Sequence, residues 1–524
     1  MTAHHPPSAP QTGRQDGFTL VELLVAIVIL GVLAAVVVVS VRGIGDTGRT
    51  SAIRADAATL RTAEESYCAK HGRYGTVDDL KTAGLLTGEP VYHMVTVGEE
   101  GRCGRGEKSS FALYDTSTVT ESTADAIPVG TTPSEVAVDE KSGRAYAVAT
   151  GSSTVTVIDG STDAPIGSPI SLAGVVSGPT RIAADPGTGR VYVGGIGGVA
   201  VIDPADGYRV SRIGGYTATV VALAVSPENG DLYIAGGSLG DSAVAHVPAG
   251  GSTATPIPLP AAGIAGASLG LDFTFDPAHH AVYLAKANLG IGSTDAASLG
   301  LFAIDARTHA ATLMTRYPTT STCGKNAGDV LLANSLRGSI AVDPARNLVY
   351  LLAKRCVPNT ANPTGPWKPV ATTIVVNPAD RSSTAINDLG GTVAPLSVVH
   401  NPAAGAVYVH LEGGSNCGAS GGRIDRITGT TVTGQAMICG VLTPGNQSRR
   451  FALLRNFNRL FVTQQNSEGS PGGIGVTDGG TLLTRAPLGA PGTFTALAVN
   501  NTTGKVYAVD ATRGTVSVYR TGPA

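Results

Sequence analysis

Glu22 is the residue whose surroundings most clearly indicate chemistry. It is a carboxylate at the front of an apolar run, because every residue from Leu23 to Val39 is apolar or glycine. A run of this length is long enough to cross most of a bilayer as a helix. A charged side chain inside a membrane costs about 2.5–3.5 kcal/mol and needs a cationic partner. We therefore interpret Glu22 as a functional residue that forms an ion pair in an apolar environment.

Cysteine is the second residue type that could do chemistry. No Cys-x-x-Cys pair occurs, and no cysteine–histidine spacing fits a zinc site. An even number of cysteines after an export helix favours disulfides in an oxidising compartment, although some could be buried free thiols. Proximity in the sequence favours the simplest of the possible connectivities, which is Cys68–Cys103, Cys323–Cys356 and Cys417–Cys439.

The histidines give little support for catalysis. His279 and His280 are adjacent in a predicted turn, where neighbouring side chains usually point apart, and His400 and His410 fall on different strands of one repeat. No His-Glu-x-x-His motif and no phosphate-binding loop occurs. We expect no catalytic residue, no metal site and no cofactor.

The N-terminal segment that carries Glu22 resembles the same segment of a known protein family. The order Gly17, Phe18-Thr19-Leu20-Val21-Glu22 and then an apolar helix closely resembles the N-terminus of type IV pilins and type II secretion pseudopilins. The resemblance implies that a membrane prepilin peptidase cuts between Gly17 and Phe18 and that the new amine of Phe18 is methylated. It also implies that Glu22 pairs with the ammonium group of a neighbouring subunit during assembly. Glycine suits the cleavage position because it has no Cβ.

A secretory signal peptide and a plain signal anchor are the alternatives for this segment. A signal peptide has a shorter apolar region and a small-residue cleavage site after it, whereas Ala34-Ala35 is followed by four valines. Arginines are more numerous after the apolar run than before it, which does not favour a cytoplasmic N-terminus, but long domains translocate largely regardless of charge. We expect a single-pass protein in the cell membrane with its C-terminal domains outside the cytoplasm, and a cell-surface filament is the other location that the resemblance implies.

The domain order follows from these elements. Residues 1–17 form a leader, and residues 18–41 form the transmembrane helix. Residues 42–115 resemble the globular part of a pseudopilin, with a helix ending at Gly72, a short helix at Val77–Ala83 and strands at Pro90–Val97 and Ser110–Tyr114. The resemblance implies an α+β pilin module.

From residue 124 to the end, the sequence repeats a triple of short strands. Each repeat carries an aromatic residue within a short apolar strand. The aromatic positions are Tyr146, Tyr192, Tyr233, Tyr283, Tyr350, Tyr408, Phe461 and Tyr507. Three strands and a variable fourth at this period are typical of an all-β propeller, and the repeats resemble YVTN-type propeller repeats. We expect residues 124–524 to form eight blades, or seven if one degenerate unit lies elsewhere; the unit at Phe461 is the weakest.

Two classes of function fit this organisation. The first is a pilin-like subunit of a type IV pilus or type II secretion-like system, in a minor or tip position, whose propeller binds an unknown ligand. The disulfide-linked loops of the propeller could supply that binding surface. The second is a surface-anchored propeller enzyme of the lactonase or lyase kind, which would require histidines and carboxylates to converge on the propeller axis. A formal charge of −2 with 15% charged residues gives no basis for recruiting nucleic acid.

Overall fold

The computed structural model describes a defined part of the chain. The described residues are 55–56, 58–88, 90, 93–97, 103, 111–121, 126–238, 243–260, 268–288, 297–319, 323, 330–331, 339–359, 367–387, 394–412, 422–438, 451–464, 473–480, 482 and 494–523. The chain divides into two compact units, one of residues 1–117 with 523–524 and one of residues 118–522. Within the described ranges, no helix has the length and apolarity needed to cross a membrane. The apolar run at residues 18–41 lies outside those ranges.

The first unit contains a helix, a short helix and a two-stranded pairing. Residues 58–71 are helical, and their buried side chains, such as Leu60 and Tyr67, recur at helical spacing. The helix ends at Gly72, whose φ of +72° suits glycine and whose N–H bonds to the Cys68 carbonyl at 2.8 Å. The short helix α2 (Val77–Thr82) is started by a capping box between Thr76 and Asp79. Strands β1 (His93–Val97) and β2 (Phe111–Glu121) then pair antiparallel.

A buried carboxylate makes this first unit sensitive to pH. Glu64 is fully buried, and its Oε2 accepts a hydrogen bond from the Gly75 N–H at 3.0 Å. Burial is the main cause that raises its pKa to about 7, from 4.5. In the unfolded chain the carboxyl ionises near its ordinary pKa, whereas in the folded unit it keeps its proton to higher pH. Folding stability therefore falls as pH rises from about 4.5 to 7.

We expect Glu64→Gln to remove this pH dependence and to stabilise the helix at pH 8 by about 2–3 kcal/mol. Glutamine is neutral at every pH and still offers an oxygen to Gly75. The measurement is the opening free energy of residues 58–71 by hydrogen exchange at pH 5 and pH 8, corrected for intrinsic rates. Glu65→Gln is the matched control, because Glu65 is the exposed neighbour on the same helix. Equal wild-type opening free energies at the two pH values would contradict the prediction.

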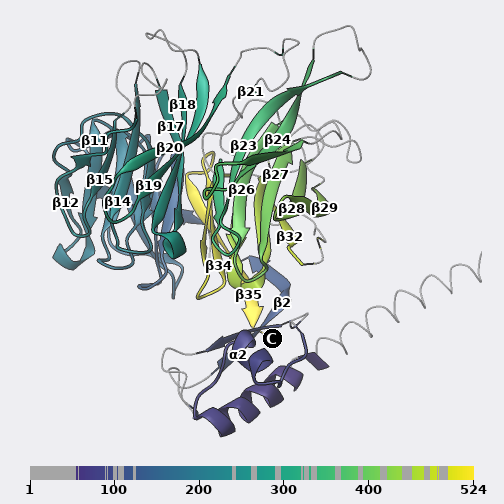
Figure 1. The fold of residues 1–524 in the computed structure, drawn as a ribbon. Coiled ribbons are helices and arrows are strands. Elements are labelled where there is room, and N and C mark those ends of the chain that lie inside the picture. Colours follow the sequence, from purple (N-terminus) through teal and green to yellow (C-terminus); the bar gives the residue numbers. More distant parts are fainter. Residues whose placement is uncertain are drawn as a thin grey trace, which may run out of the picture. The chain divides into compact units, whose positions relative to one another are not determined.

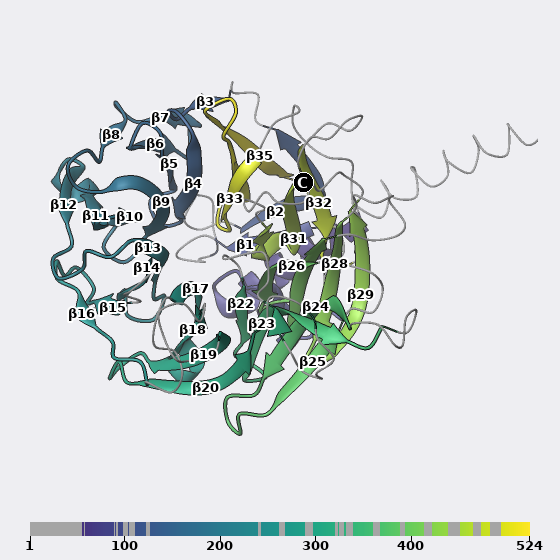
Figure 2. The same ribbon diagram turned by 90° about the horizontal axis from the view of Figure 1, so that it is seen from above.

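The second unit is a β-propeller whose described strands form eight blades, so the expectation of an all-β propeller is confirmed with eight blades (Figures 1 and 2). The first strands of successive blades lie next to one another around the axis. Blade one contains β4 (Pro133–Asp139), β5 (Arg144–Ala149), β6 (Thr154–Asp159), β7 (Ala164–Pro165) and β8 (Ile170–Ser171). Blade two contains β9 (Ser177–Ala184), β10 (Val191–Ile196), β11 (Gly198–Asp203), the turn η1 (Pro204–Asp206) and β12 (Arg209–Arg212). Blade three contains β13 (Val220–Val225), β14 (Leu232–Ser238), β15 (Val244–Val247) and β16 (Thr255–Pro256).

The remaining blades continue the same antiparallel order. Blade four contains β17 (Ser268–Asp276), the turn η2 (Pro277–His279), β18 (Ala281–Asn288), β19 (Ser298–Asp305) and β20 (Ala311–Pro318). Blade five contains β21 (Val330–Leu331), β22 (Ile340–Asp343), β23 (Leu348–Val357), β24 (Lys368–Val376) and β25 (Ser383–Asn387). Blade six contains β26 (Ala394–Asn401), β27 (Ala406–Glu412), β28 (Gly422–Thr428) and β29 (Thr431–Ile438). Blade seven contains β30 (Phe451–Leu454), the turn η3 (Arg455–Phe457), β31 (Arg459–Gln464) and β32 (Gly473–Asp478), and blade eight contains β33 (Phe494–Asn500), β34 (Lys505–Asp510) and β35 (Thr515–Pro523).

The repeated aromatic residues occupy equivalent positions in these blades. Each lies on the second strand of its blade and is buried, from Tyr146 on β5 to Tyr507 on β34. The unit at Phe461, which matches the repeat least well, forms blade seven with three described strands. Buried apolar clusters lie between neighbouring blades, and the seven tyrosine rings pack within these interfaces between repeats. This packing explains why the aromatic position recurs.

The recurrent aspartates hold the first turn of their blades. All four are nearly fully buried and lie at the end of the first strand or directly after it: Asp139, Asp185, Asp276 and Asp343. Their carboxylates accept backbone hydrogen bonds from the turn, such as Gly187 N–H to Asp185 at 2.8 Å. They are therefore turn residues, because an aspartate side chain that binds the backbone of its own turn replaces a missing peptide partner.

The ring closes by pairing residues from the two ends of the propeller. Strand β3 (Ile127–Pro128) precedes blade one but pairs antiparallel with β35 of blade eight, with Ile127 opposite Val516. The N–H of Val129 adds a hydrogen bond to the Gly514 carbonyl at 2.8 Å. The described part of residues 124–129 therefore supplies the outer strand of blade eight. Pro128 is tolerated there because an outer strand leaves one edge unpaired.

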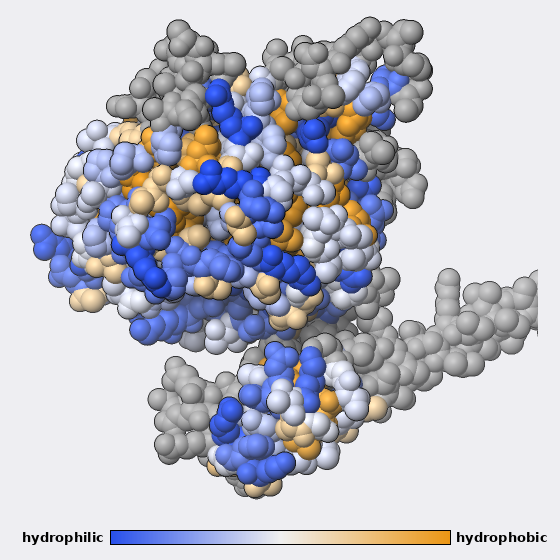
Figure 3. Space-filling view, viewed as in Figure 1, coloured by the Kyte–Doolittle hydropathy of each residue, from blue (hydrophilic) through white to orange (hydrophobic). Residues whose placement is uncertain are grey.

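The surface of the propeller is mixed in character. Among the described residues, Ile196 is the large hydrophobic side chain that is strongly exposed, at 59%. Figure 3 shows polar and apolar residues interspersed over the face in view. No extended apolar docking surface is therefore apparent on the described part of that face.

Candidate functional site

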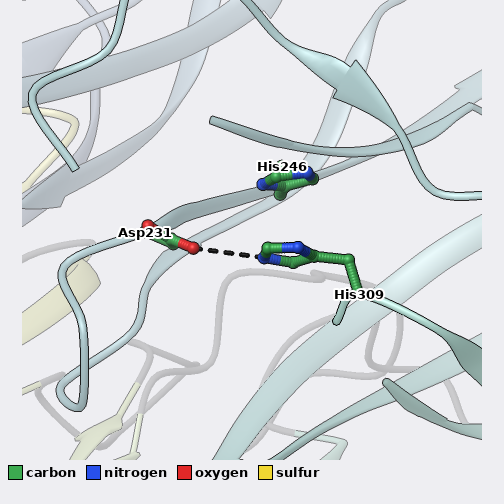
Figure 4. A group of neighbouring side chains, drawn as sticks. All are labelled: Asp231, His246 and His309. Atoms are coloured by element: carbon green, nitrogen blue, oxygen red, sulfur yellow. Dashed lines mark hydrogen bonds and ion pairs between the residues drawn. The ribbon is translucent and has the colours of Figure 1, made fainter. Parts of the chain in front are cut away.

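Three side chains that could hold a metal ion converge between blades three and four. Asp231 directly precedes β14, His246 lies in β15, and His309 lies in the turn between β19 and β20. One ligand atom from each lies within 4.8 Å of the other two (Figure 4). We call these residues the Asp231 cluster. On the neighbouring strand, Tyr233 pairs with His246. Asp231 precedes Tyr233 by two residues and therefore lies on the same face of the sheet as His246.

Asp231 is fixed by hydrogen bonds on both carboxylate oxygens. Its Oδ1 accepts from the Ala249 N–H at 2.9 Å, and its Oδ2 accepts from the Asn229 side-chain amide at 3.1 Å. The Asn229 amide also donates to the Ala306 carbonyl of the neighbouring turn at 3.2 Å. The Nε2 of His309 lies 3.2 Å from Asp231 Oδ2. The carboxylate thus already links blade three to blade four.

The two imidazoles of the cluster are stacked. The ring centroids of His246 and His309 lie 3.5 Å apart, with 12° between their planes. His246 is 8% exposed, and its buried Nδ1 has no hydrogen-bond partner among the described residues. Burial is the main cause that lowers the pKa of His246, the neighbouring His309 adds to the effect, and Asp231 opposes it. His246 is therefore neutral near pH 7, which is the state in which imidazole binds metals.

The histidines singled out from the sequence are different from these two. His279 lies 2.8 Å from Asp276, and His280 contacts Glu228, so the adjacent pair points to different carboxylates as expected. His400 lies on β26 and His410 on β27, the different strands anticipated. His246 and His309 belong to different repeats and share no motif. A weak signal existed, because His246 lies near the end of the third strand of its blade and His309 lies in the turn after the third strand of the next blade.

The described blades do not place the Asp231 cluster on the propeller axis. Its residues lie at the second and third strands of blade three and at an outer turn of blade four, whereas the inner ring is formed by first strands. Three Gly-x-Ser-x-Gly matches occur in the sequence, at Ser238, Ser268 and Ser420, and of these Ser238 and Ser268 lie among the described residues. They lie opposite each other on the paired strands β14 and β17, and not at the strand-to-helix turn that exposes a nucleophile in hydrolases.

Some of the other predicted site residues lie among the residues that the structure describes, and the rest lie outside them. Cys68 is joined to Cys103, and Cys323 is joined to Cys356, which are the pairs favoured by sequence proximity. Gly17, Phe18, Glu22, Cys417 and Cys439 lie outside the described residues, as do most of the disulfide-linked loops considered for binding.

The N-terminal segment matches a known sequence motif. Residues 12–38 match the prokaryotic N-terminal methylation motif. The N-terminus carries a prepilin-type methylation motif. This motif contains the Gly17, Phe18 and Glu22 positions singled out from the sequence. The expected pilin-like N-terminus is confirmed, while the pilin fold of residues 42–115 stays a prediction.

Curated relatives match the N-terminal part of the chain. Type II secretion system core protein G of Klebsiella pneumoniae is 40% identical over 65 residues, which is 12% of this chain and 46% of that protein. The protein of the same name from Aeromonas hydrophila is 38% identical over 68 residues, 13% of this chain and 48% of that protein. The chain spans about half the length of the curated relatives it matches.

Solved structures match the propeller. The structure of the Dos1 propeller has a TM-score of 0.50 at 11% identity and covers 75% of this chain and 94% of that chain. At this identity the likeness shows the fold alone.

Proposed function

We propose that this chain is a pilin-like subunit of a type II secretion or type IV pilus apparatus that carries a propeller outside the cytoplasmic membrane. The observation that carries the proposal is the methylation motif at residues 12–38, supported by the similarity to type II secretion system core protein G. In this role the apolar helix anchors the subunit in the membrane and packs against the helices of other pilin-like subunits. A prepilin peptidase removes residues 1–17.

The propeller sets the position of the subunit in such an assembly. Its unit spans residues 118–522, far more chain than the pilin-like part. A body of this size on every subunit would crowd the neighbours in a helical filament. We infer a minor or tip subunit whose propeller binds a ligand, and we infer that the chain is not an enzyme. The off-axis position of the Asp231 cluster gives no support to catalysis on the propeller axis.

Gly17 and Glu22 test the proposal separately. Replacing Gly17 with tryptophan should leave the full-length precursor in the membrane, because a bulky side chain obstructs the peptidase cleft. Gly13→Trp, elsewhere in the leader, is the control that should be processed normally. Replacing Glu22 with alanine makes the helix more apolar, so insertion and cleavage should persist. Incorporation into filaments should fall at least tenfold, since the Phe18 ammonium of one subunit loses its buried partner.

The measurement is a blot of the sheared surface fraction and of the membrane fraction from the same cells. Thr19→Ala is the control for Glu22→Ala, because it changes a polar neighbour without removing a charge. Glu22→Ala protein in the sheared fraction at the wild-type level would refute the assembly role. Antibody labelling of the propeller then gives its location, and uniform labelling along filament shafts would contradict a minor or tip position.

A further inference from the structure

We propose that Asp231, His246 and His309 bind one divalent transition-metal ion that links blade three to blade four. This inference concerns the propeller alone and goes beyond the proposed function. Two imidazoles and one carboxylate are a ligand set that proteins use for zinc and related ions. Calcium and magnesium prefer oxygen ligands only, so this set favours a transition metal over both.

The second observation that points to a ligand is the unpartnered nitrogen of His246. More than nine-tenths of this residue is buried, yet within the described part of the chain its Nδ1 has no hydrogen-bond partner. A buried polar atom without a partner costs about 1–3 kcal/mol. The imidazole ring of His246 stacks on that of His309, and the Nε2 of His309 lies 3.2 Å from Asp231 Oδ2 (Figure 4). A metal ion bound among these residues would give the buried nitrogen a partner.

The distances require a small adjustment of the side chains. Ligand atoms around a tetrahedral zinc ion lie about 3.3 Å apart when the metal–ligand bonds are about 2.0–2.1 Å. The ligand atoms of the cluster lie within 4.8 Å of one another, so each pair must approach by at most about 1.5 Å. A metal must also lie near the plane of each imidazole, so the stacked rings must tilt apart. His309 can make this change, because its side chain is 21% exposed and lies on a turn.

The surroundings of Asp231 suit a ligand that must be held in place. Asn229 and Ala249 donate to its two oxygens, an arrangement that orients a carboxylate toward a metal. The fourth coordination position would face the exposed side of His309 and take a water molecule. Because His309 comes from blade four and the other two ligands from blade three, the bound ion would tie adjacent blades together.

The test is Zn²⁺ binding by the purified full chain at pH 7, measured by calorimetry and by the propeller's melting temperature. We expect tight binding at one site and a melting temperature that rises with Zn²⁺ but not with Ca²⁺. His309→Asn should weaken that binding at least 100-fold and abolish the thermal shift. Asparagine suits this position because the φ of His309 is +58°, a left-handed conformation that asparagine tolerates.

His280→Asn is the matched control. His280 also has a left-handed φ, +51°, and contacts a carboxylate, but no second imidazole stacks on it. This variant should bind Zn²⁺ like the wild type. A second variant, His246→Leu, should abolish the visible absorption of Co²⁺ bound in a low-coordinate site while the metal-free protein remains folded. No Zn²⁺ binding by the wild type, or equal binding by His309→Asn, would overturn the proposal. Either outcome leaves the assembly role of Gly17 and Glu22 untouched.

Discussion

Replacing Asp163 with asparagine should destabilise the propeller by about 3–5 kcal/mol, because it removes the anion from a buried ion cluster. The carboxylate of Asp163 is fully buried in blade one. It accepts a hydrogen bond from Lys505 Nζ at 2.8 Å and another from Arg520. Both cations belong to blade eight. Lys505 is itself 9% exposed at its side chain, so the substitution would leave a buried ammonium group without its counter-charge.

Asparagine is the informative substitution at this position. The φ of Asp163 is +56°, and asparagine tolerates this conformation, so the loss reports the charge and not backbone strain. The measurement is urea unfolding, followed through the single tryptophan, Trp367, which lies in the propeller unit. Asp159→Asn in the same blade is the control and should cost under about 1 kcal/mol, because its carboxylate only caps an exposed turn. Equal midpoints for Asp163→Asn and wild type would contradict the prediction.

The same cluster should make the propeller sensitive to acid. Burial alone would raise the pKa of Asp163, but the hydrogen bonds and charges of Lys505 and Arg520 prevail and lower it. The resulting stability is fully present above the ordinary pKa of an aspartate, about 3.9, and is lost as pH falls through the lower folded value. Wild type should lose stability in this range, and Asp163→Asn should not show that loss.

Removing residues 124–129 should have the second large effect, about 4–8 kcal/mol, because it opens the ring and uncovers two apolar side chains. Ile127 is 3% exposed and Val129 is fully buried, and both pack in the cluster between blades eight and one. The deletion also removes the pairing of β3 with β35. An unchanged unfolding midpoint would refute the role of this strand in closure.

A point substitution separates packing from chain length. Ile127→Asn should cost about 2–5 kcal/mol, since it places a polar group in an apolar site. Thr255→Asn is a matched control, because Thr255 is also the first residue of a two-residue outer strand that ends in proline, but it is exposed. Its effect should stay within about 0.5 kcal/mol. A similar loss for both variants would mean that the outer strand, and not burial of Ile127, carries the effect.

Much of the propeller fold could be predicted from the sequence, because the interactions that produce it are local or recur in each repeat. A turn aspartate such as Asp185 binds backbone within a few residues, so its role needs no knowledge of distant parts. The aromatic position recurs because each blade presents the same face to its neighbour. Closure by β3 could be predicted because the last repeat lacks an outer strand and an unassigned strand precedes the first.

Neither the Asp231 cluster nor the buried ion cluster of Asp163, Lys505 and Arg520 could be predicted in this way. Lys505 and Arg520 lie 342 and 357 residues from Asp163 in the sequence, and only closure of the ring brings them into contact. His309 is 78 residues from Asp231 and reaches it across a blade interface. Repeat patterns give the order of blades but not which side chains meet between them, because this depends on how the sheets twist and pack. The sequence by itself therefore determined the methylation motif, the repeat and its closing strand, whereas tertiary packing decided which buried charges and imidazoles became neighbours.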